Sequence, residues 1–375
     1  MSEAAAFFDA VRAGDFESVH RRLDADPALV HRHDDRHFGA TALIHACGLR
    51  RLDMVDLLLE RGADIDGRSD WWAGSWGVLD SGDADFADAL IERGATLTVH
   101  AAARLGRLDE LARLLDADPD GVHAPGGDGK QPLHFAATVE VATLLLERGA
   151  DIDARDLDHV STPAQWLALE EPEVARYLLE RGARADPVLA VALGEHGALG
   201  RSLAEEGSTV RSFRIDRERF PSEEPAAGHI YLYTVGDGAT LLHVAAMVDR
   251  PETVQWLADA GADLNAGGSY DDSTALHQAA WRNAADSVRA LLAAGADPDV
   301  TSGAIHRNEA VGWAIVAGSA DAVDALIDAG CRLRGGHIED AAAGAEGRFR
   351  QFQAGRGDEA PRRIAERINR AARRS

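Results

Sequence analysis

One alternation of apolar and polar residues returns along the chain at a regular interval. In its strongest copies, Leu58–Asp64 and Leu145–Asp151, two leucines precede two charged residues, a glycine and an alanine. The glycine is typical of the left-handed residue that ends a helix, so each copy predicts the end of a helix. The glycines stand at positions 62, 94, 149, 182, 261, 295 and 330, and four of the six intervals are 32 to 35 residues. A period near 33 residues predicts a solenoid of stacked helical hairpins.

A second phrase precedes the glycine in the clearest copies. It reads Gln-Pro-Leu-His-Phe-Ala-Ala at 131–137, and related phrases begin with threonine at 240–246 and 274–280. Threonine suits the N-cap of a first helix, and proline suits the first turn of that helix. In this order, the two phrases resemble the ankyrin repeat over roughly residues 4–333. The resemblance implies an all-α fold, an ankyrin-repeat solenoid of about ten helix-turn-helix units.

The copies of the two phrases divide the chain into expected segments. Counted along the chain, the second repeat unit is 35–69, the third 70–98, the fifth 126–155 and the ninth 269–301. The third unit lacks the histidine of the second phrase, and the pattern breaks completely after residue 212. Within the break, the alternation in Ile230–Val235 is compatible with a short strand or hairpin arm. We expect an N-terminal capping repeat (1–34), ankyrin repeats (35–212), an insertion (213–236), ankyrin repeats (237–333) and a C-terminal cap with a basic tail (334–375).

The net charge of −24 narrows the classes of partner. An acidic surface repels nucleic-acid phosphates, so a nucleic-acid partner is not expected. No apolar run approaches the roughly 18 residues of a membrane span, so no membrane partner is expected either. Cys47 and Cys331 are far apart, which favours a reducing compartment and a cytoplasmic protein. Lys130 is the only lysine among many arginines, which indicates a bacterial source with a GC-rich genome.

The basic tail is expected to be a solvated or disordered terminus, like many chain ends. The alternative is that it contacts a partner or an anionic surface. Ile364, Ile368 and Ala371 follow helical spacing, which predicts a weak amphipathic helix at most.

The histidines of the repeats fall into two groups. In the ankyrin family the signature histidine ties neighbouring turns together, and His100, His134, His243 and His277 match that place. The residue after it is expected to face the concave surface. Alignment on the glycines predicts a concave row made of His45, Asp80, Ala101, Phe135, Trp166, Leu189, Val244, Gln278 and Trp313.

His45 and Asp80 are the candidate catalytic residues of this concave row. Ile44 takes the structural place of the histidine in the second unit, so His45 is expected to face the groove, with Asp80 one unit further on. An exposed histidine beside a carboxylate can act as a general acid/base pair. The alternative is a polar pair without chemistry.

Aromatic residues gather around the expected groove, above all in the finger of the third unit. They are either a binding hot spot or residues that pack on each other where the repeat is irregular. The candidate ligand- or partner-binding residues are Phe38, Trp71, Trp72, Trp76, Phe135, Asp158, His159, Trp166, Tyr231, Tyr233, Tyr270, Gln278, Trp281 and Trp313.

Two loops carry polar residues without a complete motif. The first cluster lies before the second unit and consists of His31, His33, Asp34, Asp35 and His37. An extended loop would aim His31, His33 and Asp35 in one direction as metal ligands, but the spacing matches no metal motif, so no metal site is expected. Gly126–Lys130 lacks the Gly-Lys-Ser/Thr ending of a phosphate-binding loop, so we expect a turn. No cofactor fingerprint is present, and we expect no cofactor.

Two functions are compatible with these patterns. The resemblance implies an interaction protein that binds a partner protein or peptide through its concave groove. The alternative is a small-molecule enzyme or binder, such as a cofactor-independent isomerase, cyclase or hydrolase. In that hypothesis His45, Asp80 and the tryptophans form a pocket, and residues 213–236 close over it as a lid.

Overall fold

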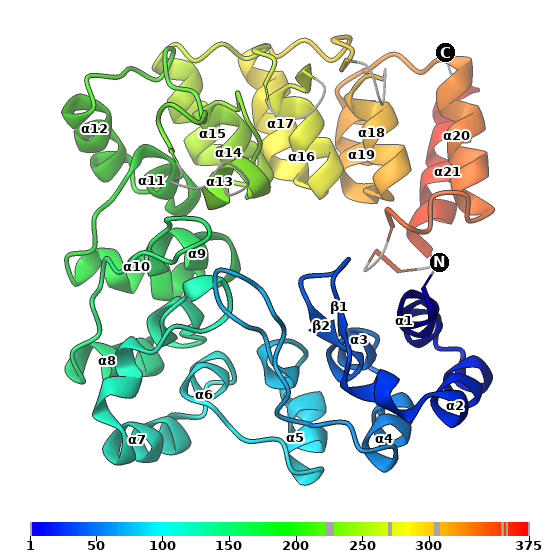
Figure 1. Ribbon diagram of the computed structural model, residues 1–375. Coiled ribbons are helices and arrows are strands. Elements are labelled where there is room, and N and C mark those ends of the chain that lie inside the picture. The colour runs from blue at the N-terminus through cyan, green and yellow to red at the C-terminus, as the bar shows by residue number, and fades with distance from the viewer. Residues whose placement is uncertain are drawn as a thin grey trace. The chain divides into compact units, whose positions relative to one another are not determined.

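Short helices that pair into hairpins are the main regular elements of the protein, and loops connect them (Figure 1). The computed structural model describes residues 2–221, 229–268, 272–303, 308–353, 356–357 and 359–373. Contacts within the chain divide it into two compact units, each of which contains several of the shorter repeat units. They are Met1–Ala183 (unit 1) and Arg184–Ser375 (unit 2). The expected all-α solenoid is therefore confirmed. None of the helices in these described ranges is both long and apolar enough to cross a membrane.

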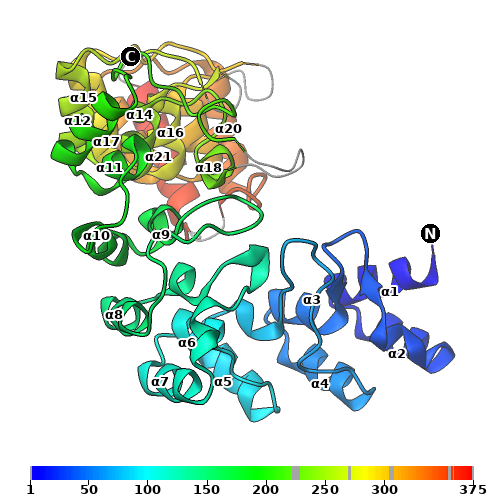
Figure 2. The same ribbon diagram turned by 60° about the vertical axis from the view of Figure 1, so that its left-hand side comes forward.

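Unit 1 is a stack of helical hairpins, in which α1 lies beside α3 and α7 beside α8 (Figure 2). Its α-helices are α1 (Glu3–Ala13), α2 (Phe16–Ala25), α3 (Ala42–Gly48), α4 (Leu52–Glu60), α5 (Ala84–Glu92), α6 (Val99–Arg104), α7 (Leu108–Ala117), α8 (Val139–Glu147), α9 (Pro163–Glu170) and α10 (Pro172–Glu180). Its 3₁₀ helices are η1 (Pro27–His31), η2 (Val78–Asp80), η3 (Pro119–His123), η4 (Gly127–Gly129) and η5 (Pro132–Phe135).

Side-chain caps and glycines set the helix ends as expected. The hydroxyl groups of Thr41 and Thr98 accept hydrogen bonds from backbone amides in the first turns of α3 and α6. Gly62, just beyond α4, has φ of 88°, the left-handed conformation that glycine adopts without strain. The apolar faces of these helices form a core that includes the fully buried rings of Phe7 and Phe8.

The described strands are two short segments in the loop, or finger, that connects the N-terminal capping repeat to the first helix of the next repeat. β1 (His33–Asp34) pairs antiparallel with β2 (Ala40–Thr41), with Asp34 opposite Ala40. Phe38 and Gly39 in the connecting loop both have positive φ, 57° and 64°, which turns the chain back tightly. Among the described residues, the β segment is therefore this hairpin, and the described part of the insertion contains no strand.

The fifth unit combines the clearest signature phrase with a very short first helix. Gln131 lies only 18 residues before Gly149, against 21 residues from Thr274 to Gly295 in the ninth unit. With three residues fewer, the chain forms the single 3₁₀ turn η5 and then enters α8 at its cap, Thr138. The third unit also lacks a first α-helix and has η2 in its place.

Unit 2 contains two rows of helices, α11, α14, α16, α18 and α20 in one row and α15, α17, α19 and α21 in the other. The bounds are α11 (Pro187–Leu193), α12 (His196–Glu205), α13 (Ile230–Thr234), α14 (Leu241–Met247), α15 (Pro251–Asp259), α16 (Ala275–Arg282), α17 (Ala285–Ala294), α18 (Ala310–Ala317), α19 (Ala320–Asp328), α20 (Gly335–Ala345) and α21 (Glu359–Ala372).

The segment Ile230–Val235 does not form the strand that its alternation suggested. Residues 230–234 form α13, a helix of five residues. Ile230 and Tyr231 are adjacent and both buried, whereas a strand would place them on opposite faces. The Tyr231 hydroxyl group donates a hydrogen bond to Asp186 at 3.1 Å, which ties α13 to the start of α11.

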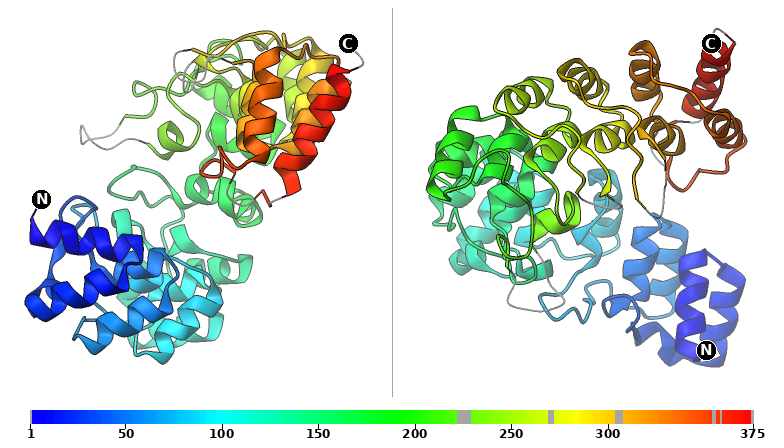
Figure 3. Two further views of the ribbon diagram at one scale, coloured as in Figure 1. Left: turned by 90° about the vertical axis from the view of Figure 1, so that its right-hand side faces the viewer. Right: turned by 90° about the horizontal axis from the view of Figure 1, so that it is seen from above.

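Much of the described basic tail is the helix α21, which packs in unit 2, so the expectation of a solvated segment is wrong for this helix. α21 packs beside α20 and α19 (Figure 3). Ile364 and Ile368 are buried, as their helical spacing predicted. Arg363 forms ion pairs with Asp321 and Asp324, and Arg367 with Asp324 and Asp328, so the basic helix neutralises acidic residues of α19.

Candidate functional site

The signature histidines hold neighbouring repeats together, as predicted. The Nε2 atom of each contacts a backbone carbonyl oxygen of the following finger at 2.8 to 3.1 Å. Burial lowers the pKa of His134, His243 and His277 to about 4, so these imidazoles are neutral and donate to the carbonyl groups. They are linkers between turns rather than catalytic groups.

Most of the expected concave row is buried instead of facing a groove. Ala101, Leu189 and Val244 are completely covered, and Gln278 and Trp313 are nearly so. The position after the histidine packs between successive first helices, as the contacts from α14 to α16 and from α16 to α18 indicate. The prediction that this position is exposed is therefore wrong for these five residues.

A dense polar group lies between α1, the β1–β2 hairpin and α3. This Asp34 cluster consists of Asp9, Arg12, Asp34, Arg36, His37 and His45. Asp34 is buried and accepts hydrogen bonds from Arg12 and, at 3.1 Å, from Arg36. Burial alone would raise the pKa of the Asp34 carboxyl group, but the hydrogen bonds from Arg36 and Arg12 outweigh it and lower the pKa to about 2.

His45 points into the Asp34 cluster. Its Nε2 atom is 3.3 Å from Asp34 Oδ2, and its ring lies against Phe8 and His37 at centroid distances of 5.7 and 5.6 Å. Burial, together with the positive charge of Arg12, lowers the pKa of His45 to about 4 despite the nearby Asp34 carboxylate. The imidazole is therefore neutral at physiological pH.

Asp80 is not the carboxylate beside His45. Its side chain accepts a hydrogen bond from the Gly77 amide at 2.6 Å and another from Arg68 at 3.3 Å. Within the described residues, no hydrogen bond or ion pair joins Asp80 to His45. The alignment failed here because Asp80 belongs to η2, which replaces the first helix of the third unit.

The Asp34 cluster also contains potential metal ligands. One ligand atom from each of Asp34, His37 and His45 lies within 4.8 Å of the other two, which makes them a candidate set in the described part of the chain. Two of these residues, Asp34 and His37, belong to the loop cluster noted in the sequence, but the residues expected to point in one direction, His31, His33 and Asp35, are not in the set. His33 instead forms an ion pair with Asp70.

A second constellation surrounds the only lysine. The Nζ atom of Lys130 lies 3.9 Å from the ring centroid of Trp166 and 4.9 Å from those of Trp76 and Phe135. The Nζ atom also forms an ion pair with Asp128 Oδ2 at 3.5 Å. We call these five residues the Lys130 cage. Three residues predicted to bind a partner thus hold a cation of the chain itself.

The turn around Lys130 confirms one prediction and extends another. Gly126–Lys130 forms a turn, with Asp128 at φ of 60°. Burial raises the pKa of the Asp128 carboxyl group, although the Lys130 and His159 charges oppose that rise. The ring of His159 lies 5.2 Å from that of Trp166, and Asp158 is buried beside His159. Both residues therefore adjoin the Lys130 cage.

Exposed aromatic residues gather at the tips of the second and third fingers. Phe38 is 63% exposed and Trp72 is 51% exposed. Trp71 connects them, with its ring centroid 4.7 Å from that of Phe38 and 6.0 Å from that of Trp72. We call Phe38, Trp71 and Trp72 the finger patch. It matches the sequence prediction of an aromatic surface in this finger.

The candidates in unit 2 serve mainly in packing. Tyr231 is buried, Gln278 is hydrogen-bonded to Ser273, and the Trp313 indole N–H donates to Ser302. Trp281 packs against Trp313 and Phe352. Tyr233 is half-exposed, and Tyr270 lies outside the described residues.

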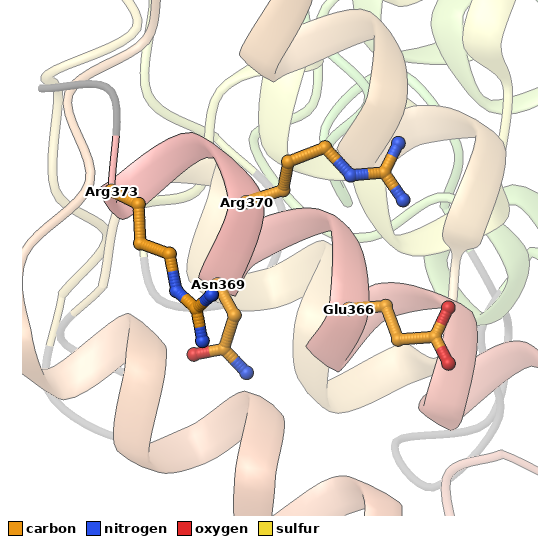
Figure 4. A pocket seen from close by; sticks show the side chains of 4 residues that line it. All are labelled: Glu366, Asn369, Arg370 and Arg373. Atoms are coloured by element: carbon orange, nitrogen blue, oxygen red, sulfur yellow. The ribbon is translucent and has the colours of Figure 1, made fainter.

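An open hollow in unit 2 adds a further surface feature. It lies beside α21 and is lined by Glu366, Asn369, Arg370 and Arg373 (Figure 4). The side chains are spread along the helix and do not converge on one point. The hollow therefore lacks the convergent polar groups of a small-ligand site.

Sequence reasoning missed the roles of Arg12 and Lys130, and it noted Asp34 and His37 only as members of a loop cluster, without assigning them to a site. Asp34 and His37 stand in the His- and Asp-rich loop that was considered for metal binding, so composition pointed to the segment but not to the residues that converge. The one lysine of a chain with plentiful arginine was a signal for Lys130, because a residue used once can occupy a special environment.

Comparison with known families gives the same fold. A model described as ankyrin repeats in three copies matches residues 99–189 and 222–302, and an ankyrin repeat model matches residues 38–67. Together these ranges cover more than half of the chain. The protein belongs to the ankyrin-repeat family.

The curated relatives of this ankyrin-repeat protein match only a short part of it. Ankyrin repeat and SAM domain-containing protein 6 of Mus musculus is 33% identical over 91 residues, which are 22% of this chain and 10% of the relative. The Rattus norvegicus protein of that name is 32% identical over 91 residues, with the same coverage. The matched part thus spans about a tenth of these relatives.

Two solved structures of ankyrin repeat domains are among the chains that match this one. The human ASB11 ankyrin repeat domain covers 64% of this chain and 100% of its own, with a TM-score of 0.39 and 24% identity. The ankyrin repeat domain of Bcl-3, a member of the IkappaB family, covers 58% of this chain and 93% of its own, with a TM-score of 0.32 and 23% identity.

Proposed function

We propose that this chain binds a partner protein or peptide through its finger side, with the finger patch as the central contact. Ankyrin repeats are generally protein-interaction modules, and their fingers border the concave groove. The observation that carries the proposal is the exposure of Phe38 and Trp72 beside Trp71. Covering this apolar area stabilises a complex by roughly 25 cal/mol for each Å² buried, and tryptophan is preferred at binding hot spots.

The partner is expected to carry basic residues. The chain has a net charge of −24, and the exposed Asp70 side chain directly precedes Trp71. Complementary charge speeds association and is screened by salt. Cationic side chains also stack favourably on tryptophan rings. Binding should therefore weaken as the salt concentration rises.

The finger patch can be tested directly with Trp72→Ala. We expect this variant to weaken binding by more than about 1 kcal/mol, or at least fivefold in Kd, because an exposed hot-spot ring is lost without disturbing the core. The partner is captured from the source cells with the full chain, identified and purified, and its Kd is measured by calorimetry. Leu108→Ala, an exposed apolar truncation on α7, is the matched control. Equal Kd values for the wild type and Trp72→Ala would reject the proposal.

A small-molecule enzyme has less support. The aromatic walls formed by Trp76, Phe135 and Trp166 surround the chain's own ammonium group, so they do not offer an apolar pocket to a ligand. His45 and Asp80 do not form the candidate acid/base pair, because His45 lies beside Asp34 and Asp80 forms an ion pair with Arg68. Most of the segment considered as a lid, residues 222–228, lies outside the described residues.

We also infer a bacterial cytoplasm as the setting. Two distant cysteines with no partner in the described structure agree with a reducing compartment. The bacterial origin rests on the use of arginine in place of lysine. Subcellular fractionation of the source cells, with an antibody against the chain, tests the compartment.

A further inference from the structure

Three side chains from the junction of the N-terminal capping repeat and the next repeat converge inside the Asp34 cluster. Asp34 belongs to β1, His37 to the loop of the hairpin and His45 to α3. The short β1–β2 pairing holds Asp34 above the start of α3, so residues eleven positions apart in the chain come into contact. One carboxylate oxygen and one nitrogen from each imidazole lie within 4.8 Å of one another.

The distances in this group match those between ligands of one metal ion. In tetrahedral zinc sites with bonds of roughly 2.0 to 2.1 Å, neighbouring ligand atoms are about 3.3 Å apart. Asp34 Oδ2 is 3.0 Å from His37 Nδ1 and 3.3 Å from His45 Nε2. The ligand atoms of the two imidazoles lie within 4.8 Å of each other, so the three groups already stand around one point.

His45 supplies an independent indication. Its side chain is 10% exposed, yet its Nε2 atom has no hydrogen-bond partner within the described part of the protein. The 3.3 Å approach to Asp34 therefore lacks the alignment of a hydrogen bond. A buried polar atom without a partner costs free energy. In native proteins such an atom usually contacts an ion or a water molecule.

We propose that Asp34, His37 and His45 form a binding site for a divalent transition-metal ion of the zinc class. Two imidazoles and one carboxylate are donors that suit Zn²⁺ better than Ca²⁺ or Mg²⁺, which prefer oxygen ligands alone. Three protein ligands leave a fourth position open, the arrangement of zinc sites that bind water or substrate. His37, whose side chain is 44% exposed, is on the solvent side of the site.

Two neighbouring arginines affect this site in different ways: Arg36 orients the Asp34 carboxylate, and the charge of Arg12 competes with a bound ion. Arg36 Nε donates to Asp34 Oδ1, which orients the carboxylate and leaves Oδ2 toward the histidines. Arg12 Nη1 contacts Asp34 Oδ2 and His37 Nδ1, so it must move when an ion binds. Its other nitrogen, Nη2, already bonds Asp9, which leaves the displaced guanidinium group paired.

The experiment titrates the full chain with Zn²⁺ in the presence of a chromophoric competing chelator. We expect the wild type to bind one equivalent that His37→Ala loses or binds at least about tenfold more weakly. His37 is partly exposed, so this variant leaves the core intact. His33→Ala is the matched control, because His33 is in the same hairpin but pairs with Asp70. Arg12→Gln is expected to bind Zn²⁺ more tightly, because it removes the competing charge.

Two further measurements keep the outcome decisive. Asp34→Asn should abolish the site, and circular dichroism shows whether that variant is folded. Substitution with Co²⁺ should give a visible absorption band in the wild type that is absent in His37→Ala. Equal Zn²⁺ affinity of the wild type and His37→Ala would overturn the proposal, as would an equal loss in His33→Ala.

Discussion

At the scale of single residues, the protein satisfies buried charge in two different ways. Asp34 is surrounded by guanidinium and imidazole groups, and hydrogen bonds to them lower its pKa to about 2 although burial opposes that shift. Lys130 has one carboxylate nearby, and its other close neighbours are aromatic faces. The first group has an orphan imidazole nitrogen, which makes it the better place to look for a ligand.

The Lys130 cage predicts that charge, rather than size, is essential at position 130. Lys130→Met keeps a similar volume but removes the cation from three rings and leaves Asp128 unpaired. We expect the free energy of unfolding to fall by about 1 to 3 kcal/mol. Denaturant unfolding followed by tryptophan fluorescence and circular dichroism measures this loss.

The control for this prediction is Arg113→Met, an exposed position on α7 that should change the free energy by less than about 0.5 kcal/mol. Similar stability of Lys130→Met and the wild type would mean that the cage contributes no net stabilisation.

Residue roles were predictable from the sequence only where the repeat itself dictates them. His134, His243 and His277 were assigned correctly because each occurs at a fixed place in a local phrase. The role of Asp34 was missed because its partners come from α1, the hairpin and α3, and no local pattern encodes such a meeting. His45 was correctly separated from the signature histidines, but its carboxylate partner was misassigned.

At the scale of elements, the length of a repeat determines which of its helices form. The fifth unit keeps the signature residues, yet it has three residues fewer between its cap and its glycine, and its first helix shrinks to η5. In α13 and α21, by contrast, packing against neighbouring elements rather than repeat length determines that a helix forms. Their helical state depends on burial of Tyr231, Ile364 and Ile368 against neighbours, and that burial is not visible in propensity alone.

The docking of α21 predicts that Ile368 anchors this element. Ile368→Ala removes a fully buried side chain and should destabilise the packing of α21 by about 2 to 4 kcal/mol. Hydrogen exchange of the α21 amides should become faster, with a smaller effect in α19 and α20.

Arg370→Ala is the matched control on the same helix, because Arg370 is exposed beside the hollow. Unchanged exchange in Ile368→Ala would show that the ion pairs of Arg363 and Arg367 suffice to hold the helix.

At the scale of the whole molecule, the same buried imidazole recurs from unit to unit. His134 in unit 1 and His243 and His277 in unit 2 are neutral linkers with pKa values of about 4. In an unfolded chain histidine has a pKa of about 6.5. The unfolded chain therefore binds more protons between these two values, so acid weakens both units by one mechanism.

We predict that the free energy of unfolding is constant above about pH 6.5 and falls as the pH decreases toward 4. Each linker histidine should contribute on the order of 2 kcal/mol to this loss, because folding must keep it neutral. Denaturant titrations at intervals from pH 7.5 to 4.5 measure the slope.

His243→Gln should reduce that slope, and His20→Gln, at an exposed position, should leave it unchanged. A slope that is equal in all three proteins would assign the acid sensitivity to other groups.

The burial of the only lysine has a practical consequence for chemical labelling. Lys130 is 6% exposed, so an amine-reactive reagent cannot reach its ε-amino group while the turn at residues 126–130 stays closed. Incorporation of the label then reports how often this turn opens. The protein thus carries a built-in probe of opening at one position, readable by mass spectrometry without any substitution.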